Sequence, residues 1–143
     1  MSTALRKVTE NLGGVTVLGR DIDNELDLVE LIEGGLPFET TERIVKAKVV
    51  TADEFKNLVV APTTLSRRRK EGKLDAGESD RLVRLTRVVE LARDALGPEK
   101  GDKWMRRPNR ALKGKIPLEL CRSEAGARLV EAVLDRINYG GIS

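Results

Sequence analysis

Few residues of this chain are of the types that enzymes use for chemistry. Its 143 residues include no histidine and a single cysteine, Cys121. Without histidine, the Ser-His-Asp and Cys-His arrangements that activate a nucleophile cannot form, and zinc sites that combine Cys with His cannot be assembled. Cys121 has no histidine to serve as its base, so we expect it to be a small core residue.

The carboxylates and glycines offer no catalytic pattern either. The acidic side chains are scattered over expected helix surfaces, and no pair lies in an apolar surrounding that would separate two pKa values for acid–base catalysis. Gly13-Gly14 is not followed by the Gly-Lys-Ser or Gly-Lys-Thr of a phosphate loop, and Gly114-Lys115 is followed by Ile116. The sequence therefore predicts a protein that is not an enzyme and that uses neither a metal nor a cofactor.

The basic residues are the more informative group. Lys and Arg number 26 against 23 Asp and Glu, which gives a net charge of +3 and an isoelectric point near 9.2. The charge is unevenly distributed, because residues 1–50 carry −3, residues 51–96 carry +2 and residues 97–143 carry +4, which sum to +3. Two basic segments thus follow an acidic one, and anionic partners are expected.

The densest basic cluster follows a helix–turn–helix pattern. Thr51-Ala52-Asp53-Glu54 matches a capping box that begins a helix through residue 58, and residues 63–71 predict a second helix that Gly72 ends. In such a motif the second helix enters the major groove of DNA. The expected DNA contacts are Thr63, Thr64, Ser66, Arg67, Arg68, Arg69 and Lys70. A solvated basic face is the competing interpretation of the same residues.

Apolar spacing predicts helices along most of the chain, so the expected fold class is all-α. The further predicted helices span residues 21–33, 39–49, 75–96, 117–121 and 123–138. Residues 13–19 could be extended. The polar residues 98–103 indicate a junction between a helical domain of residues 1–97, which holds the helix–turn–helix, and a small helical domain of residues 98–143.

Two helix faces carry specific expectations. In the helix of residues 21–33, the apolar side chains Ile22, Leu26, Val29 and Ile32 recur at helical spacing and predict its buried face. In the long helix of residues 75–96, the basic side chains Arg81, Arg84 and Arg87 recur every three residues. We expect those arginines to form a solvent face, with a phosphate-contacting stripe as the alternative.

No segment favours a membrane or an export signal. No stretch reaches the roughly 18 apolar residues of a membrane span, and the N-terminus lacks the apolar core of a signal peptide. A single cysteine gives no sign of an oxidising compartment. A soluble protein of the cytoplasm that does not associate with membranes is expected.

The C-terminal segment carries residues at characteristic spacings: Trp104, Pro108-Asn109, Leu112, Gly114, Pro117-Leu118, Glu124-Ala125-Gly126-Ala127 and Ile137-Asn138-Tyr139-Gly140. This pattern resembles the C-terminal toxin-binding domain of the Xre/MbcA/ParS antitoxins. Upstream, Gly34-Gly35-Leu36-Pro37, Thr64-Leu65-Ser66-Arg67-Arg68 and Glu78-Ser79-Asp80-Arg81-Leu82 resemble the Xre-like helix–turn–helix half of the same family. The resemblance covers residues 28–143, and the two halves occur in the order of the family.

The resemblance implies an antitoxin of a type II toxin–antitoxin system, encoded beside a RES-domain toxin that destroys NAD. Such antitoxins form homodimers and larger complexes with the toxin, and they repress their own promoter by binding operator DNA. They inhibit the toxin by placing the C-terminal region at its active site. Carried onto this chain, the toxin contacts are Asn109, Leu112, Glu124, Gly126, Arg128 and the expected tail of Tyr139, Gly140, Gly141, Ile142 and Ser143.

One departure from the family pattern concerns DNA binding. Relatives commonly have a serine at the start of the second helix of the motif, where this chain has Ala61-Pro62. We therefore expect a weaker cap at that helix. Two other functional classes stay open at this point: a helix–turn–helix regulator without a toxin partner, and a structural adaptor that does not bind DNA.

Overall fold

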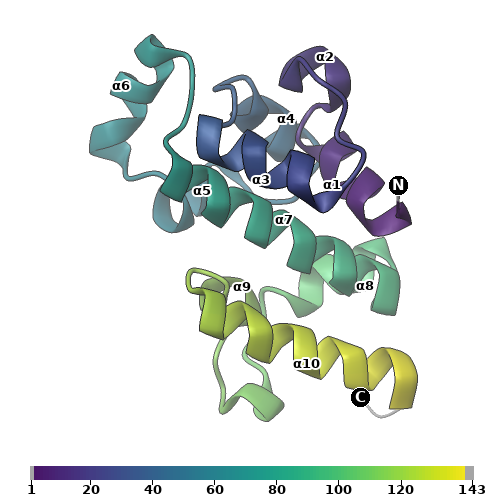
Figure 1. The fold of residues 1–143 in the computed structure, drawn as a ribbon. Coiled ribbons are helices and arrows are strands. Elements are labelled where there is room, and N and C mark those ends of the chain that lie inside the picture. Colours follow the sequence, from purple (N-terminus) through teal and green to yellow (C-terminus); the bar gives the residue numbers. More distant parts are fainter. Residues whose placement is uncertain (1, 141–143) are drawn as a thin grey trace. The chain divides into compact units, whose positions relative to one another are not determined.

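The structure is a computed structural model that describes residues 2–140, which are helical with no β-strand (Figure 1). The elements are α1 (Thr3–Asn11), α2 (Gly14–Leu18), α3 (Glu25–Gly34), α4 (Thr40–Lys46), α5 (Ala52–Leu58), α6 (Pro62–Glu71), α7 (Ala76–Leu96), α8 (Pro98–Trp104), the 3-10 helix η1 (Arg110–Leu112), α9 (Pro117–Leu120) and α10 (Glu124–Gly140). The chain forms two compact units, Met1–Val83 and Arg84–Ser143, and the division falls within α7. The expected all-α fold class is confirmed.

The first unit folds around aliphatic side chains that come from nearly every one of its helices. The fully buried members include Leu12, Leu28, Leu36, Ile44, Leu74 and Leu82. The second unit has its own core, which includes Leu85, Val88, Val89, Met105, Leu118, Val130 and Leu134. In the sequence, apolar residues at helical spacing predict a buried stripe in α7 of Leu82, Leu85, Val88, Val89, Ala92 and Leu96, and one in α10 of Ala127, Val130, Val133, Leu134 and Ile137. All are buried except Leu96 and Ile137, which are half-buried, so both predicted stripes are confirmed.

Two expectations for the N-terminal region are wrong. Residues 13–19 are not extended; they form the short helix α2, which ends at Gly19 in the left-handed conformation with φ 75°. The buried face of α3 is made by Leu28 and Leu31, whereas Leu26 is 67% exposed. The predicted stripe was counted from Ile22, which is buried but precedes the Asn24 cap of α3, so the helical period does not fix its direction.

The expected solvent face of Arg81 and Arg84 is also wrong. Arg81 Nη2 donates to the carbonyl oxygen of Val59 at 2.8 Å, and Arg84 Nη1 donates to that of Arg122 at 3.0 Å. Each guanidinium satisfies a carbonyl in its own unit that the helices leave without a backbone partner. Only Arg87 of the three is exposed.

The polar stretch after Gly97, which the sequence indicates as a junction, forms the helix α8. Gly97 turns the chain with φ 93°, and Pro98 occupies the first position of α8, where its missing N–H costs nothing. Asp102 accepts from Arg93 Nε at 2.7 Å, which ties α8 to α7. Gly101 is buried against the backbone of Ala92, where a larger side chain would collide.

The last helix is longer than the sequence pattern indicates. Tyr139 and Gly140 belong to α10, so the expected tail does not begin at Tyr139. The rest of that expected tail, Gly141, Ile142 and Ser143, lies outside the described residues. Ile137 is the last apolar residue of the predicted helix. Asn138 and Tyr139, which follow it, continue the helix and are exposed.

A glycine at the start of α10 allows the closest backbone approach in the second unit. Gly126 is buried, and a Cβ at that position would run into the carbonyl oxygen of Leu120, at the end of α9. The Ser123 Oγ accepts from the Gly126 N–H at 3.0 Å and caps the helix. The turn between α9 and α10 therefore depends on the absence of a side chain.

Replacing this glycine tests that dependence. We expect Gly126→Ala to lower the free energy of unfolding by about 3 kcal/mol, because the new methyl group forces a backbone shift in a packed region. Chemical denaturation followed by circular dichroism measures the change. Gly77→Ala is the matched control in α7, where a Cβ meets only ordinary contacts, and it should stabilise the chain by about 0.5–1 kcal/mol. Equal effects of the two substitutions would contradict the argument.

Candidate nucleic-acid and toxin interfaces

Helices α5 and α6 form the predicted helix–turn–helix. The Thr51 Oγ1 accepts from the Glu54 N–H at 3.1 Å, and the Glu54 carboxylate accepts from the Thr51 N–H at 2.8 Å, so the predicted capping box is confirmed. Helix α6 starts with Pro62 at its first turn, and its cap residue Ala61 makes no side-chain cap hydrogen bond. The weaker cap that the sequence predicts is therefore present.

The end of α6 is fixed by a short stretch of backbone pairing. Gly72 adopts φ 81° and closes the helix, and its carbonyl oxygen accepts from the Phe38 N–H at 2.9 Å. The Leu74 N–H donates to the Leu36 carbonyl oxygen at 2.9 Å. The Leu36 N–H in turn donates to the buried Ser79 Oγ at 2.9 Å. The segment before α4 and the segment after α6 are thus held together.

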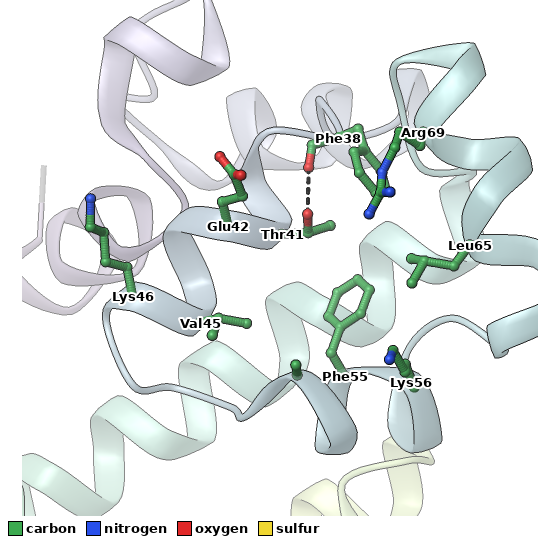
Figure 2. Close-up of a pocket in the computed structure, with 10 residues that line it drawn as sticks. Phe38, Thr41, Glu42, Val45, Lys46, Phe55, Lys56, Leu65 and Arg69 are labelled. Atoms are coloured by element: carbon green, nitrogen blue, oxygen red, sulfur yellow. Dashed lines mark hydrogen bonds between the residues drawn. The ribbon is translucent and has the colours of Figure 1, made fainter.

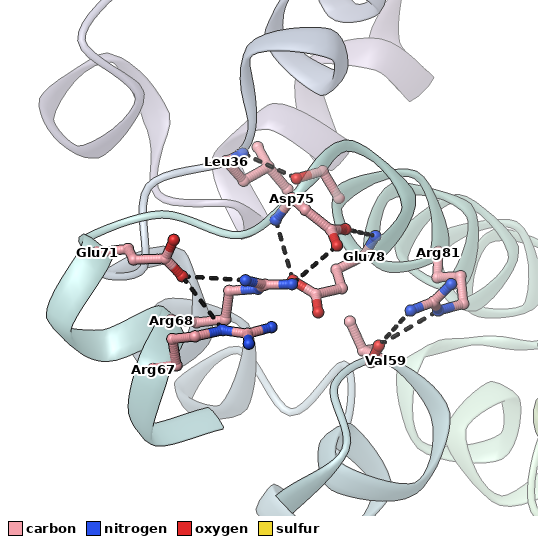
Figure 3. Close-up of polar contacts among 9 residues, drawn as sticks. Leu36, Val59, Arg67, Arg68, Glu71, Asp75, Glu78 and Arg81 are labelled. Atoms are coloured by element: carbon pink, nitrogen blue, oxygen red, sulfur yellow. Dashed lines mark hydrogen bonds and ion pairs between the residues drawn. The ribbon is translucent and has the colours of Figure 1, made fainter. Parts of the chain in front are cut away.

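Arg68 is the polar anchor of α6 (Figure 3). Its Nε donates to Glu78 at 2.7 Å, its Nη1 to Glu71 at 3.0 Å and its Nη2 to Asp75 at 2.9 Å. The Arg68 side chain is only 12% exposed. The acceptors Glu78 and Glu71 raise the pKa of Arg68 above its ordinary value, so its charge is fixed. Arg68 is therefore engaged within the fold and is not presented to a partner.

The same carboxylates begin α7. The Asp75 Oδ1 accepts from the Glu78 N–H at 2.7 Å, and the Glu78 Oε1 accepts from the Asp75 N–H at 3.0 Å. This reciprocal arrangement satisfies donors that the first turn of a helix leaves free. The cap of α7 and the anchor of α6 are thus one network, which also explains why Glu78 is nearly buried.

The solvent face of α6 is made by four of the expected DNA-contacting residues. Thr63, Ser66, Arg67 and Lys70 are all exposed. Their spacing of three, four and seven residues places them on one face of the helix. No residue of α6 is fully buried. The structure thus brings two short hydroxyl side chains and two cations together on one accessible surface, which we call the α6 outer face.

The other expected DNA residues point elsewhere. Thr64 is half-buried. The Arg69 guanidinium lies 5.4 Å from the centroid of the Phe38 ring, a cation–π geometry. Leu65 is also half-buried. These residues and Arg68 lie around the side of α6 away from its outer face.

In the second unit, three of the expected toxin contacts hold the fold. The Asn109 Oδ1 caps η1 by accepting from the Ala111 N–H at 2.9 Å. Leu112 is buried, and Gly126 is buried at the α9–α10 turn. Some of the residues that mark this segment in the sequence therefore stabilise its fold, and their side chains expose little surface to a partner.

The solvent side of α10 presents the remaining expected contacts within the described residues. Glu124 and Arg128 form an exposed pair, with Arg128 Nε 3.1 Å from Glu124 Oε1. Tyr139 is 85% exposed. Leu129, which the sequence analysis missed, is 57% exposed. A leucine outside the apolar stripe of α10 was the signal that could have identified it.

We call this surface of Glu124, Arg128, Leu129 and Tyr139 the α10 outer face. With Ala125, Ala132 and Arg136, which are also exposed, it forms a stripe of apolar and charged side chains along the helix. Exposed tyrosine and arginine side chains are among the anchors that protein interfaces prefer, and the exposed leucine beside them adds apolar surface.

The single cysteine and the acidic side chains of residues 2–140 show no sign of a reactive thiol or a metal site. Burial raises the pKa of Cys121 to about 12, so its thiol stays protonated at neutral pH. Among residues 2–140, no three His, Cys, Asp or Glu side chains are grouped so as to hold a metal ion. No helix within the described part of the chain is long and apolar enough to cross a membrane.

Comparison with known proteins matches two family domains to successive parts of this chain. Residues 91–140 match the model of the antitoxin Xre/MbcA/ParS C-terminal toxin-binding domain, and residues 27–87 match the antitoxin Xre-like helix-turn-helix domain. An antitoxin Xre from Yersinia enterocolitica is 30% identical over 120 residues, which cover 81% of each chain. The chain belongs to the Xre antitoxin family.

Two other relatives agree. An antitoxin Xre from Photorhabdus laumondii is 36% identical over 75 residues, which cover 51% of each chain. One from Pseudomonas putida is 23% identical over 121 residues, which cover 84% of this chain and 76% of the relative. The resemblance found in the sequence is confirmed, and with it an antitoxin of the type II class rather than an enzyme. The toxin-binding domain implies a toxin partner and the helix–turn–helix implies DNA.

The Arg68 network generates a prediction that separates its role from that of its neighbour. We expect Arg68→Ala to lower the thermal midpoint of unfolding, because three carboxylates lose the cation that they share. Glu78, whose side chain is buried, would then keep its charge without a paired cation. Arg67→Ala is the matched control, since Arg67 is exposed and reaches only Glu71 at 3.8 Å. It should leave the midpoint unchanged in the same calorimetric measurement. A larger loss in the Arg67 variant would contradict the assigned roles.

Proposed function

We propose that the α6 outer face binds the operator DNA of the chain's own operon, and that the bound antitoxin represses that operon. The observation that carries this proposal is the grouping of Thr63, Ser66, Arg67 and Lys70 on the exposed side of the second helix of the motif. Hydroxyls and cations of this kind contact base edges and phosphates. We place the DNA on a homodimer, because helix–turn–helix dimers bind two half-sites one helical turn apart.

The salt dependence of DNA binding tests this surface. We expect Arg67→Ala and Lys70→Ala each to weaken binding to a duplex from the operon's promoter and to reduce the slope of log K against log salt by about 1. Fluorescence anisotropy at several salt concentrations measures both quantities. Lys100→Ala is the control, because Lys100 is an exposed cation of α8 in the other unit. An unchanged slope in the Arg67 and Lys70 variants would overturn the assignment.

We further propose that the α10 outer face binds the toxin and that this toxin is a RES-domain enzyme that degrades NAD. Support for the surface comes from the exposure of Leu129 and Tyr139 beside the Glu124–Arg128 pair within the region that matches the toxin-binding domain. Large apolar side chains held on a rigid helix lose little conformational entropy when a partner covers them. Inhibition then follows from the C-terminal region reaching the active site of the toxin.

A charge on this face should break the complex. We expect Leu129→Glu to weaken binding to the RES-domain protein encoded beside this chain by about 30-fold, since a central hot spot contributes about 2 kcal/mol or more. Co-purification and growth rescue after co-expression report the loss. Leu26→Glu is the matched control, because Leu26 is an equally exposed leucine on α3 and its substitution should preserve the complex.

Truncation separates binding from inhibition. Removal of residues 140–143 should reduce rescue of growth more than it reduces co-purification, because the truncated chain keeps all four residues of the α10 outer face. Full protection by the truncated chain at equal expression would show that the C-terminal region does not block the active site. A neighbouring protein that is harmless and forms no complex would favour a DNA-binding regulator without a toxin.

A further inference from the structure

A groove opens in the first unit on the side of α6 away from its outer face (Figure 2). Residues of α4, α5 and α6 line it together with Phe38, and its volume is about 600 Å³. We call it the α4–α6 groove. It exists because α6 is anchored at its C-terminal end by Arg68 and contributes no fully buried side chain to the core.

The inner surface of the groove is apolar and partly aromatic. Figure 2 shows the Phe55 ring directed into the space, with Val45 on one side and Leu65 on the other. Phe38 forms the wall nearest to α6. Phe38 and Phe55 are the two phenylalanines of the chain, so the groove holds half of its four aromatic residues. Phe55 is only 3% exposed, so the edge of its ring forms the floor of the groove. The half-buried side chains Phe38, Val45 and Leu65 offer the more accessible apolar surface to a hydrophobic body.

The edge of the groove carries a positive balance. Lys46, Lys56 and Arg69 line it against a single carboxylate, Glu42. Among the described residues, none of these three cations has a carboxylate partner within ion-pair distance, and Arg69 instead lies over the Phe38 ring. Figure 2 shows the guanidinium of Arg69 at the mouth of the groove, beside Phe38. The local charge is therefore available to an anion from solution.

We propose that the α4–α6 groove binds a small organic anion, with a flat apolar body against Phe38 and Phe55 and an acidic group toward Arg69 and Lys56. A carboxylate, sulfonate or phosphate would each satisfy this chemistry. The volume falls in the usual range of small-molecule sites, which combine an apolar lining with a few placed polar groups. Arg69 would contribute both its charge and its stacking on the aromatic wall.

This site is independent of the proposed toxin and DNA surfaces. Its residues are distinct from the α10 outer face, and Leu65 and Arg69 share only the helix with the α6 outer face. An occupant would nevertheless contact α6, the helix that we propose for DNA. Any change that the occupant makes in the affinity for DNA would be matched by an equal change that DNA makes in the affinity for the occupant. The test below uses neither DNA nor toxin, so its result stands apart from theirs.

The experiment uses 8-anilinonaphthalene-1-sulfonate, an aromatic anion with a flat naphthalene ring, as the probe of the full-length chain. We expect one saturable site per chain by fluorescence titration. Arg69→Gln should weaken the probe about tenfold, because it removes a charge-assisted contact. Arg67→Gln, which removes an exposed cation of the same helix outside the groove, should change the affinity less than twofold by the same reasoning.

Two further arms complete the test. N-phenyl-1-naphthylamine, the same aromatic body without the sulfonate, should bind weakly and should not distinguish the two variants. Ala52→Trp should block the sulfonate probe by filling the groove, since Ala52 is an exposed first residue of α5 that lines it. Thermal melts show whether each variant is folded.

Any of the following results would overturn the proposal. One is the absence of saturable binding by the sulfonate probe. Another is an equal loss of affinity in the Arg67 and Arg69 variants, or an unchanged affinity in a folded Ala52→Trp variant. The last is burial of the groove by a second copy of the chain, in which case the probe would be excluded from the dimer and Arg69→Gln would change the sedimentation coefficient.

Discussion

The proposed DNA surface of the first unit depends on the ion pairs that the Arg68 guanidinium forms. Helix α6 buries no side chain completely, so hydrophobic packing alone does not fix it. The ion pairs from Arg68 to Glu78 and Asp75 connect α6 to the first turn of α7 instead. Because the same two carboxylates also cap α7, loss of the arginine would disturb the start of a helix as well as the position of its neighbour.

This mode of attachment leaves α6 with two different accessible sides. Its outer face presents Thr63, Ser66, Arg67 and Lys70, while Leu65 and Arg69 border the groove. A helix packed by an apolar stripe would have filled that space and would have exposed only its outer face. Because ion pairs attach α6 instead, the unit keeps an apolar groove with a cationic edge beside the helix that we propose for DNA.

In the second unit, a long amphipathic helix, α10, is supported by much shorter elements. Gly126 lets α10 approach the end of α9 closely, and Arg84 donates to the carbonyl oxygens of Cys121 and Arg122 at the turn. Asn109 and Leu112 hold the segment before α9. The inner stripe of α10 is buried in the core, and its solvent side exposes Leu129 and Tyr139, the two residues that we propose for toxin binding.

The sequence alone determined the helical class, the capping box at Thr51, the apolar stripes of α7 and α10 and the family, because these depend on local spacing and on residues adjacent in the chain. It did not determine which polar side chains would be used internally. Arg68 and Arg81 look like surface cations in the sequence, and only the tertiary structure brings them to Glu78 and to the Val59 carbonyl oxygen. Leu129 lies outside the apolar stripe of α10, and the structure shows that its side chain is 57% exposed. Side-chain roles of this kind are set by long-range contacts, which helical periodicity does not encode.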